Sequence, residues 1–159
     1  MEKTNVMRIL DQKKIKYEMH EYPHTDGVVV DGENVAKLLN QDPSQVFKTL
    51  VTIGNDKKYY VCVIPVLKEL DLKQAAKAFN VKSLEMIHVK DINQVTGYIR
   101  GGCSPIGMKK SYPTVIDSSA LNYDKIIFSA GKIGYQVEMD PRLLKNIIRV
   151  DFNDITRGD

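Results

Sequence analysis

The residues most able to do chemistry lie in GYIRGGCSPIG, residues 97–107, where four of eleven positions are glycine. The stretch matches neither the dinucleotide-binding pattern G-x-G-x-x-G nor the phosphate-binding pattern G-x-x-x-x-G-K-[ST]. Glycine allows the backbone to approach another group closely, and Pro105 stiffens the segment. Such a loop can direct backbone N–H groups at a carbonyl or carboxylate oxygen, or it can simply be a turn. The residues alone leave both interpretations open.

A catalytic thiol at Cys103 would need a base and a group to orient that base. The three histidines are His20, His24 and His88, and no motif connects any of them to Cys103. His20 and His24 are four residues apart, but they flank a strand end and a proline and not one face of a helix. No compact set of Cys, His or Asp residues completes a metal site. We therefore expect no metal and no other cofactor.

Lys48 stands at the start of the apolar run KTLVTI, residues 48–53. A lysine in this place can be an edge residue that extends its amine to water. It can also be an ammonium held in position to bind an anion. A second glycine-containing loop, SAGKIG at 129–134, follows an apolar run, and loops at strand ends are common places for sites. The spacing allows both loops and Lys48 to share one pocket without requiring it.

Composition excludes several classes of protein. The chain has 159 residues and a net charge of +3, which suits one domain over residues 1–159 and falls short of a dedicated nucleic-acid binder. We expect no DNA partner and only local contact with RNA. The first ten residues, MEKTNVMRIL, are polar and charged at the start and lack the apolar core of a signal peptide, so we expect no secretory leader. The longest apolar run, residues 59–67, is too short to cross a bilayer. Two cysteines without a disulfide framework, one of them Cys62 in that apolar run, favour a reducing cytoplasmic setting.

Four capping signals predict where helices begin. Thr4, Asp31 and Asp71 each precede apolar residues at helical spacing, and Asp42-Pro43 opens a short turn. Further helices are expected over 89–97, ended by Gly97, and after Asp140-Pro141.

Alternation of polar and apolar residues predicts the strands. Residues 48–53 and 59–66 should form a hairpin, and the second of these strands should be buried on both faces. The other expected strands lie in 14–22, PTVID, KIIFSA and YQVEM, and residues 84–87 are ambiguous. Short strands separated by single helices indicate an α+β fold with a mixed sheet.

These stretches, taken together, resemble the YbaK/EbsC family of aminoacyl-tRNA deacylases, in particular the Cys-tRNA(Pro) deacylase branch. That family is related to the editing domain of bacterial prolyl-tRNA synthetase. The resemblance covers nearly the whole chain in family order and is most specific in the glycine loop. The matching stretches are KTNVMRILD, FKTLV, VCVIPV, ELDLKQAAKA, VTGYIRGGCSPIGMKK, PTVID and SAGKIG.

The resemblance implies a mixed, twisted, partly barrel-like sheet flanked by helices. It implies hydrolysis of the ester that joins a mischarged amino acid to the 3′-terminal adenosine of tRNA, with cysteine on tRNA(Pro) as the expected substrate. Lys48 aligns with the family's essential lysine, and Tyr22 with a pocket position. The substrate loop would comprise Gly101, Gly102, Cys103, Ser104 and Pro105, and a second pocket wall Ser129, Ala130 and Gly131.

The same resemblance implies catalysis without a metal or an enzyme nucleophile, in which the substrate's own thiol attacks its ester. Prolyl-tRNA synthetase would be the partner that selects the tRNA. Three other functions stay open: a deacylase for alanine or serine, a non-catalytic module that binds tRNA or a synthetase, and a small-molecule binding domain.

Overall fold

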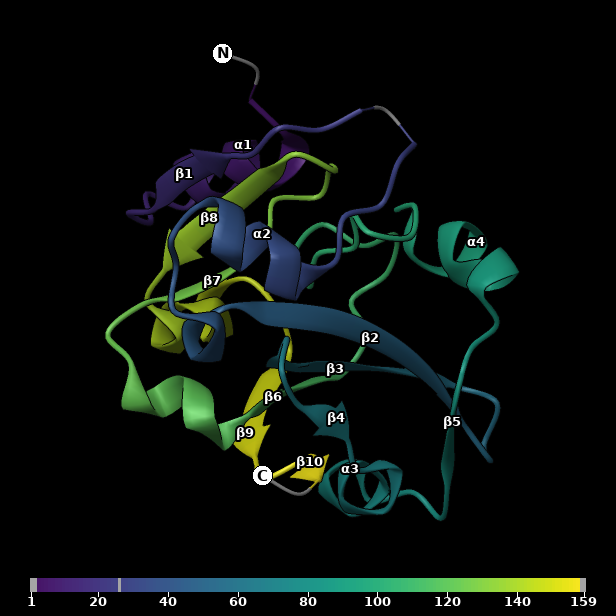
Figure 1. The fold of residues 1–159 in the computed structure, drawn as a ribbon. Coiled ribbons are helices and arrows are strands. Elements are labelled where there is room, and N and C mark those ends of the chain that lie inside the picture. Colours follow the sequence, from purple (N-terminus) through teal and green to yellow (C-terminus); the bar gives the residue numbers. More distant parts are fainter. Residues whose placement is uncertain (1–2, 26, 158–159) are drawn as a thin grey trace.

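The computed structural model describes residues 3–25 and 27–157, and a five-stranded mixed sheet forms its centre (Figure 1). The strand order is β5-β2-β3-β6-β9, in which β2 and β3 form the predicted antiparallel hairpin. Strand β6 pairs parallel with both β3 and β9, so the sheet is mixed. The strands are β2 (Phe47–Gly54), β3 (Tyr59–Pro65), β5 (Leu84–Met86), β6 (Thr114–Asp117) and β9 (Val150–Asn153).

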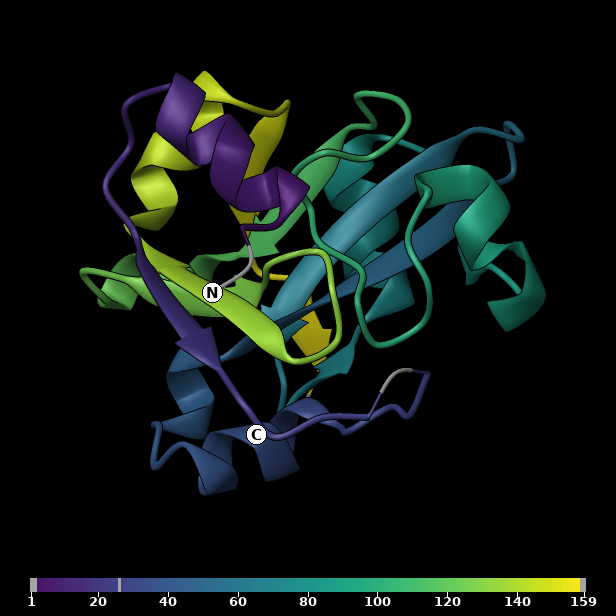
Figure 2. The same cartoon turned by 90° about the horizontal axis from the view of Figure 1, so that it is seen from above.

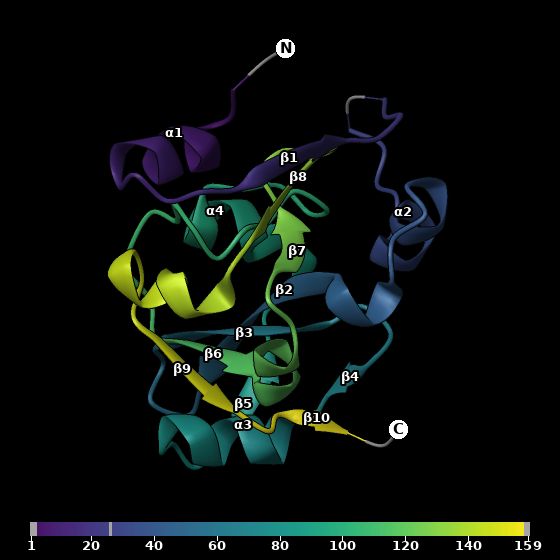
Figure 3. The same ribbon diagram turned by 90° about the vertical axis from the view of Figure 1, so that its left-hand side faces the viewer.

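A second sheet of three antiparallel strands lies above the first, between it and α1 (Asn5–Gln12) (Figure 3). Its order is β1-β8-β7, built from β1 (Glu18–Glu21), β8 (Tyr135–Met139) and β7 (Ile126–Ser129). The two sheets are joined where Val46 and Ile127 form a single parallel bridge just before β2. The α+β class with a mixed sheet is confirmed, but the strands divide among separate sheets.

The predicted helix caps are confirmed at each helix start. The Thr4 hydroxyl accepts a hydrogen bond from the Met7 backbone, and Asp31 and Asp71 cap α2 (Gly32–Leu38) and α3 (Leu72–Phe79) in the same way. Asp42 caps the short 3₁₀ turn η1 (Pro43–Gln45).

Other elements differ from expectation in length or type. The strand expected over 14–22 is confined to β1, because Lys14 turns the chain with a φ of 58° after α1. Residues 84–87, ambiguous from sequence, contribute the short strand β5.

Both remaining helices are tighter or shorter than expected. The segment 89–97 splits into η2 (Val89–Asp91) and α4 (Ile92–Thr96), which ends at Gly97 as predicted. The segment after Asp140 is the 3₁₀ helix η4 (Pro141–Asn146).

Four short elements were not anticipated. They are β4 (Glu69–Leu70), η3 (Ser118–Asn122), β9 and β10 (Thr156–Arg157), and β4 pairs with β10 in a two-stranded sheet. Within the described ranges, no helix combines the length and apolar character that crossing a bilayer requires.

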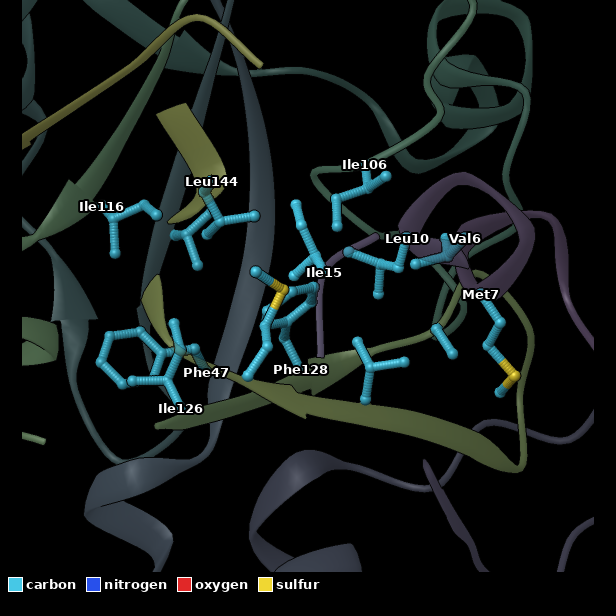
Figure 4. Close-up of a cluster of buried hydrophobic side chains, with 14 of the residues drawn as sticks. Val6, Met7, Leu10, Ile15, Phe47, Ile106, Ile116, Ile126, Phe128 and Leu144 are labelled. Carbon is cyan, nitrogen blue, oxygen red and sulfur yellow. The ribbon is translucent and has the colours of Figure 1, made fainter. Parts of the chain in front are cut away.

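The main core lies between the two sheets and α1 (Figure 4). Val6, Met7 and Leu10 on one face of α1 pack with Phe128 of β7 and with residues of the five-stranded sheet. A second cluster, which includes Cys62, Ile64 and Ala75, covers the opposite face of β3 under α3. Strand β3 is therefore buried on both faces and Cys62 is fully buried, as predicted.

Asp117, the last residue of β6, should be a polar residue of the five-stranded sheet on which the stability of the fold depends strongly. Its carboxylate is buried and accepts hydrogen bonds from the Ile155 and Ser119 backbone N–H groups at 3.0 and 3.2 Å and from the Ser119 hydroxyl at 2.6 Å. We expect Asp117→Ala to lower the free energy of unfolding by about 2–3 kcal/mol, measured by urea denaturation. The control Asp42→Ala removes one exposed cap and should cost about 0.5–1 kcal/mol; equal small losses would contradict this assignment.

Candidate active site

A cavity of about 360 Å³ opens along one edge of β2. Strand β2 pairs with β3 along its whole length, but on its other side β5 pairs only with residues 52–54. Between the Val46–Ile127 bridge and that pairing, the edge of β2 is not covered by a strand. The cavity occupies this gap, and its other walls come from residues 29–35, from the segment 86–92, from residues 100–103, and from β7 and β8.

Five of the predicted site residues line this one cavity although they are far apart in the sequence. They are Tyr22, Lys48, Gly101, Cys103 and Ser129. The other five do not line it but adjoin the lining residues in sequence, in the same two loops: Gly102, Ser104, Pro105, Ala130 and Gly131. The structure thus brings the two glycine loops to one pocket but divides each into a lining part and a supporting part.

The two glycine loops lie side by side (Figure 2). A Cβ atom on Gly102 would stand 3.3 Å from the backbone nitrogen of Ile133, so the absence of a side chain there allows loop to pack on loop. Gly101 adopts a φ of 87°, which disfavours other residues, and a Cβ there would meet Val29 at 3.0 Å. At Gly101 and Gly102 the lack of a side chain therefore allows other parts of the protein to pack closely against this stretch. Of these two glycines, only Gly101 lines the cavity.

The supporting residues hold the loops in place. Ser104 is fully buried and its hydroxyl accepts a weak bond from the Ile106 backbone at 3.4 Å. Ala130 is fully buried, and the Ser129 hydroxyl accepts from the Gly131 backbone at 3.1 Å. Pro105 lines a different, smaller hollow of about 240 Å³. These residues fix the position of Gly101, Cys103 and Ser129.

Lys48 is partly buried at the cavity, and no carboxylate among the described residues forms an ion pair with it. Arg100 adds a second cationic side chain to the lining. Asp31 is the one carboxylate among the described lining residues, and its oxygens are engaged by the backbone and side chain of Asn34 at 2.9 Å. The local charge of the cavity therefore favours an anionic ligand.

Tyr22 is held firmly at the cavity wall. Its backbone N–H donates to the Gly134 carbonyl at 2.9 Å, and its ring packs with Val35 and Ile133. The backbone carbonyl of Tyr22 in turn lies 2.9 Å from Nδ1 of His24. The loop at 129–134 and the segment after β1 are thereby joined behind the cavity.

Two polar residues of the cavity lining, Thr49 and Gln136, were not predicted from the sequence. The Thr49 hydroxyl is buried and has no hydrogen-bond partner among the described residues. The backbone of Thr49 also points to the uncovered edge of β2, because alternate residues of a strand face opposite sides and the Val51 carbonyl already bonds Ile87 on that side. Gln136 of β8 is buried, and its carbonyl oxygen accepts from the Gln41 side chain at 2.9 Å. Neither residue had a distinguishing signal in the sequence, because β2 and β8 each carry other polar residues, such as Lys48 and Glu138.

Cys103 is poorly suited to act as a nucleophile. Burial raises the pKa of its thiol to about 11, although a hydrogen bond with Thr96 acts in the opposite direction. The thiol is therefore protonated at neutral pH. Furthermore, none of the three histidines lines the cavity, so the described residues offer Cys103 no imidazole base there.

The side chains of His20 and His24 do not share one site. His24 bonds the Tyr22 carbonyl, whereas His20 Nε2 lies 2.7 Å from a carboxylate oxygen of Glu138. Glu18 lies near enough to His20 and Glu138 to share an ion, but Lys125 already contacts Glu18 at 3.5 Å. This cluster lies on β1 and β8 and does not include a residue of the cavity lining.

Comparison with known proteins identifies the family. The model of the aminoacyl-tRNA editing domain matches residues 28–147, which include most of the cavity lining. The chain belongs to the aminoacyl-tRNA editing domain family. It is 46% identical, over 98% of its length and 94% of the relative's, to a protein of Enterococcus faecalis proposed to be a Cys-tRNA(Pro)/Cys-tRNA(Cys) deacylase, EbsC. The resemblance stated from the sequence is thus confirmed.

Two further similarities agree with this family. The chain is 23% identical over 106 residues to a proline–tRNA ligase of Lactobacillus helveticus, which corresponds to 67% of this chain and 19% of the ligase. A crystal structure of a proposed trans-editing enzyme for prolyl-tRNA synthetase superposes with a TM-score of 0.80 at 20% identity, covering 99% of this chain and all of that one. At that identity the superposition shows a shared fold.

Two threonines of β2 provide a test of the Thr49 environment. Thr52 is fully buried and its hydroxyl donates to the Tyr60 carbonyl at 2.8 Å, whereas the Thr49 hydroxyl is unpartnered. We expect Thr52→Val to lower the free energy of unfolding by about 1–2 kcal/mol and Thr49→Val to leave it unchanged or raise it by about 1 kcal/mol. Thermal unfolding of both variants measures this difference, and a loss for Thr49→Val equal to that for Thr52→Val would contradict it.

The thiol of Cys103 should react slowly with alkylating agents. A pKa raised from 9.0 to about 11 lowers the thiolate fraction at pH 8 by about 100-fold, since each pKa unit above the ambient pH removes a factor of ten. Mass spectrometry of the iodoacetamide-treated native protein would give the rate, with unfolded protein as the reference. Modification of native Cys103 at the unfolded rate would show that its thiol is not protected.

Proposed function

We propose that this protein hydrolyses Cys-tRNA(Pro), releasing cysteine that was wrongly attached to tRNA(Pro). Membership of the editing-domain family makes the chain an aminoacyl-tRNA deacylase. The proposed amino acid and tRNA follow from the 46% identity to the E. faecalis protein, whose name carries Cys-tRNA(Pro) as a substrate. The observation that carries the proposal is that Lys48, which has no ion-pair partner among the described residues, shares one cavity with the glycine loop.

Lys48 supports binding of the tRNA 3′ end. An ammonium without a carboxylate partner can bind a phosphate or ribose oxygen through charge-assisted hydrogen bonds. It would fix the aminoacyl ester relative to the cavity walls, and such positioning accounts for a large part of many enzymatic accelerations. In this proposal Lys48 orients the substrate and carries no proton in the reaction.

The ester carbonyl would lie near Gly101 and Cys103, the two residues of this loop that, with Arg100, line the cavity. Negative charge develops on the carbonyl oxygen when a nucleophile attacks, and backbone N–H groups stabilise it without rearranging. The packing of Gly102 on Ile133 favours this role, because it holds the loop rigidly before substrate arrives.

We further propose that the nucleophile is the thiol of the substrate cysteine. Its sulfur attacks its own carbonyl carbon, a C–S bond forms, the ester C–O bond breaks, and the ribose oxygen leaves with a proton. Water then hydrolyses the resulting thiolactone to cysteine. The protonated state of Cys103 and the lack of a histidine in the described lining support a mechanism without an enzyme nucleophile.

This chemistry would also supply selectivity. Cysteine, alanine and proline differ little in size, and such differences discriminate by only about 1–3 kcal/mol. A step that requires a substrate thiol excludes alanine and proline altogether. Selection of the tRNA would fall to prolyl-tRNA synthetase acting beside this protein, because a net charge of +3 provides few phosphate contacts.

The decisive experiment measures deacylation of Cys-tRNA(Pro), with Pro-tRNA(Pro), Ala-tRNA(Pro) and Ser-tRNA(Pro) as controls. The wild type should release cysteine and spare the others. Lys48→Ala should lower kcat/KM by about 10–100-fold through loss of a charge-assisted bond. The exposed Lys58 gives a matched control, Lys58→Ala, and Cys103→Ala should retain turnover.

Other results would identify other functions. Cleavage of Ala-tRNA or Ser-tRNA as fast as Cys-tRNA would replace the thiol mechanism with a deacylase for another small amino acid. No turnover of any substrate by folded protein would indicate a module that binds tRNA or a synthetase.

A further inference from the structure

Three aliphatic side chains stand exposed around the mouth of the cavity. Val29, Met86 and Val89 all line the cavity, yet they are 45%, 45% and 56% exposed. They come from three separate segments: the loop before α2, the end of β5, and the start of η2. We call these three residues the apolar collar.

The collar is the main concentration of exposed large hydrophobic residues in the described part of the chain. Two more such residues adjoin the lining in sequence, since Val28 precedes Val29 and Ile99 precedes Arg100. Single exposed aliphatic residues need no explanation, but several gathered around one opening mark a binding surface. The rest of the exposed set is Leu38, Leu67 and Leu121.

The collar is built on ordered structure and does not depend on a ligand for its shape. Met86 is paired with Thr52 across β5 and β2, and Val89 begins η2. Val29 is packed against Gly101 so closely that a Cβ there would stand 3.0 Å from it. The contact surface is therefore present before anything binds, which lowers the entropy cost of binding.

Charge at the same opening identifies the kind of ligand. Lys48 and Arg100 line the cavity, Lys90 follows Val89 in the chain, and the carboxylate of Asp31 is already occupied by Asn34. A ligand with apolar flat faces joined by negatively charged links matches this combination. Unpaired nucleotides have this chemistry, because each base presents an apolar face and each phosphodiester one negative charge.

We propose that the apolar collar binds the 3′ end of the RNA whose ester occupies the cavity. It would contact the base of the terminal adenosine and the unpaired base that precedes it. This inference rests on the proposed function. An aminoacyl group within the cavity is covalently attached to the terminal ribose, so that nucleoside must lie at the mouth. Aliphatic contact with base faces reads no base edge, so the collar supplies affinity without sequence selectivity.

A double-mutant cycle tests the contact directly. The protein variant is Val29→Ser/Val89→Ser, and the RNA is an unacylated acceptor-stem minihelix ending either in adenosine or in an abasic terminal residue. For the wild type, loss of the base should weaken binding about tenfold. The collar variant should bind the adenosine-ended RNA about tenfold more weakly and should not distinguish the two RNAs.

Matched controls separate this effect from loss of structure. Leu121→Ser alters an exposed leucine of η3 that does not line the cavity and should leave binding unchanged. Arg100→Ala should weaken both RNAs equally and reduce the salt dependence, because it removes a phosphate contact and no base contact. Equal thermal unfolding temperatures for all variants would establish that folding is intact.

Kinetics supply the second measurement. On Cys-tRNA(Pro) the collar variant should raise KM about tenfold with kcat nearly unchanged. If the wild type hydrolyses Cys-tRNA(Pro) but the collar variant equals it in KM and in both RNA affinities, the collar proposal fails and the proposed function stands. If the wild type is inert, the proposed function fails, and the minihelix cycle still decides the collar.

A protein partner is the competing occupant of the collar. Should the variant keep its RNA affinities and KM but lose stimulation by prolyl-tRNA synthetase, the collar would be a protein-docking surface, and the nucleotide proposal would be overturned.

Discussion

The uncovered edge of β2 is the constraint on which the site depends. Strand β2 is fixed by β3 along one side, but on the other side the described residues bond its backbone only near its ends: at the Val46–Ile127 bridge, and from Val51 onward by Ile87 and β5. A sheet edge left open inside a fold exposes backbone polar groups that must find partners. Here the uncovered part of the edge lies at the cavity, so ligand groups can meet it. Lys48 and Thr49 belong to this part of β2, which explains why both line the cavity.

The rigidity of the opposite wall follows from packing between the two glycine loops. Gly102 lies against the backbone at Ile133, and the Tyr98 hydroxyl donates to the Ile106 carbonyl within the first loop. These contacts restrict the backbone conformations that the glycines would otherwise allow the first loop to adopt. The cavity wall is therefore prepared in advance, and a site that works by positioning needs this property.

Local signals in the sequence were sufficient for the helix caps at Thr4, Asp31 and Asp71 and for the β2–β3 hairpin, because these depend on neighbouring residues. The family resemblance identified five lining positions, Lys48 among them, but it could not show that Gly101 lines the cavity and Gly102 does not. That division depends on which residue faces Ile133, a contact between segments thirty residues apart. Thr49 was missed for a related reason: the lack of a hydrogen-bond partner is a property of the fold, and a threonine in a strand is unremarkable in sequence.

The polar and apolar parts of the cavity have separable tasks. In the proposed function, the cationic side chains at Lys48 and Arg100 would bind charge that every tRNA carries, and the aliphatic residues at the mouth would contact surface that every base carries. Neither contact would distinguish one aminoacyl-tRNA from another. A protonated Cys103 and the lack of a histidine in the described lining support the proposal that the protein supplies no strong nucleophile of its own. Discrimination would then come from the reactivity of the attached amino acid and from whatever delivers the tRNA. A cavity that positions any small aminoacyl ester is sufficient for such a mechanism.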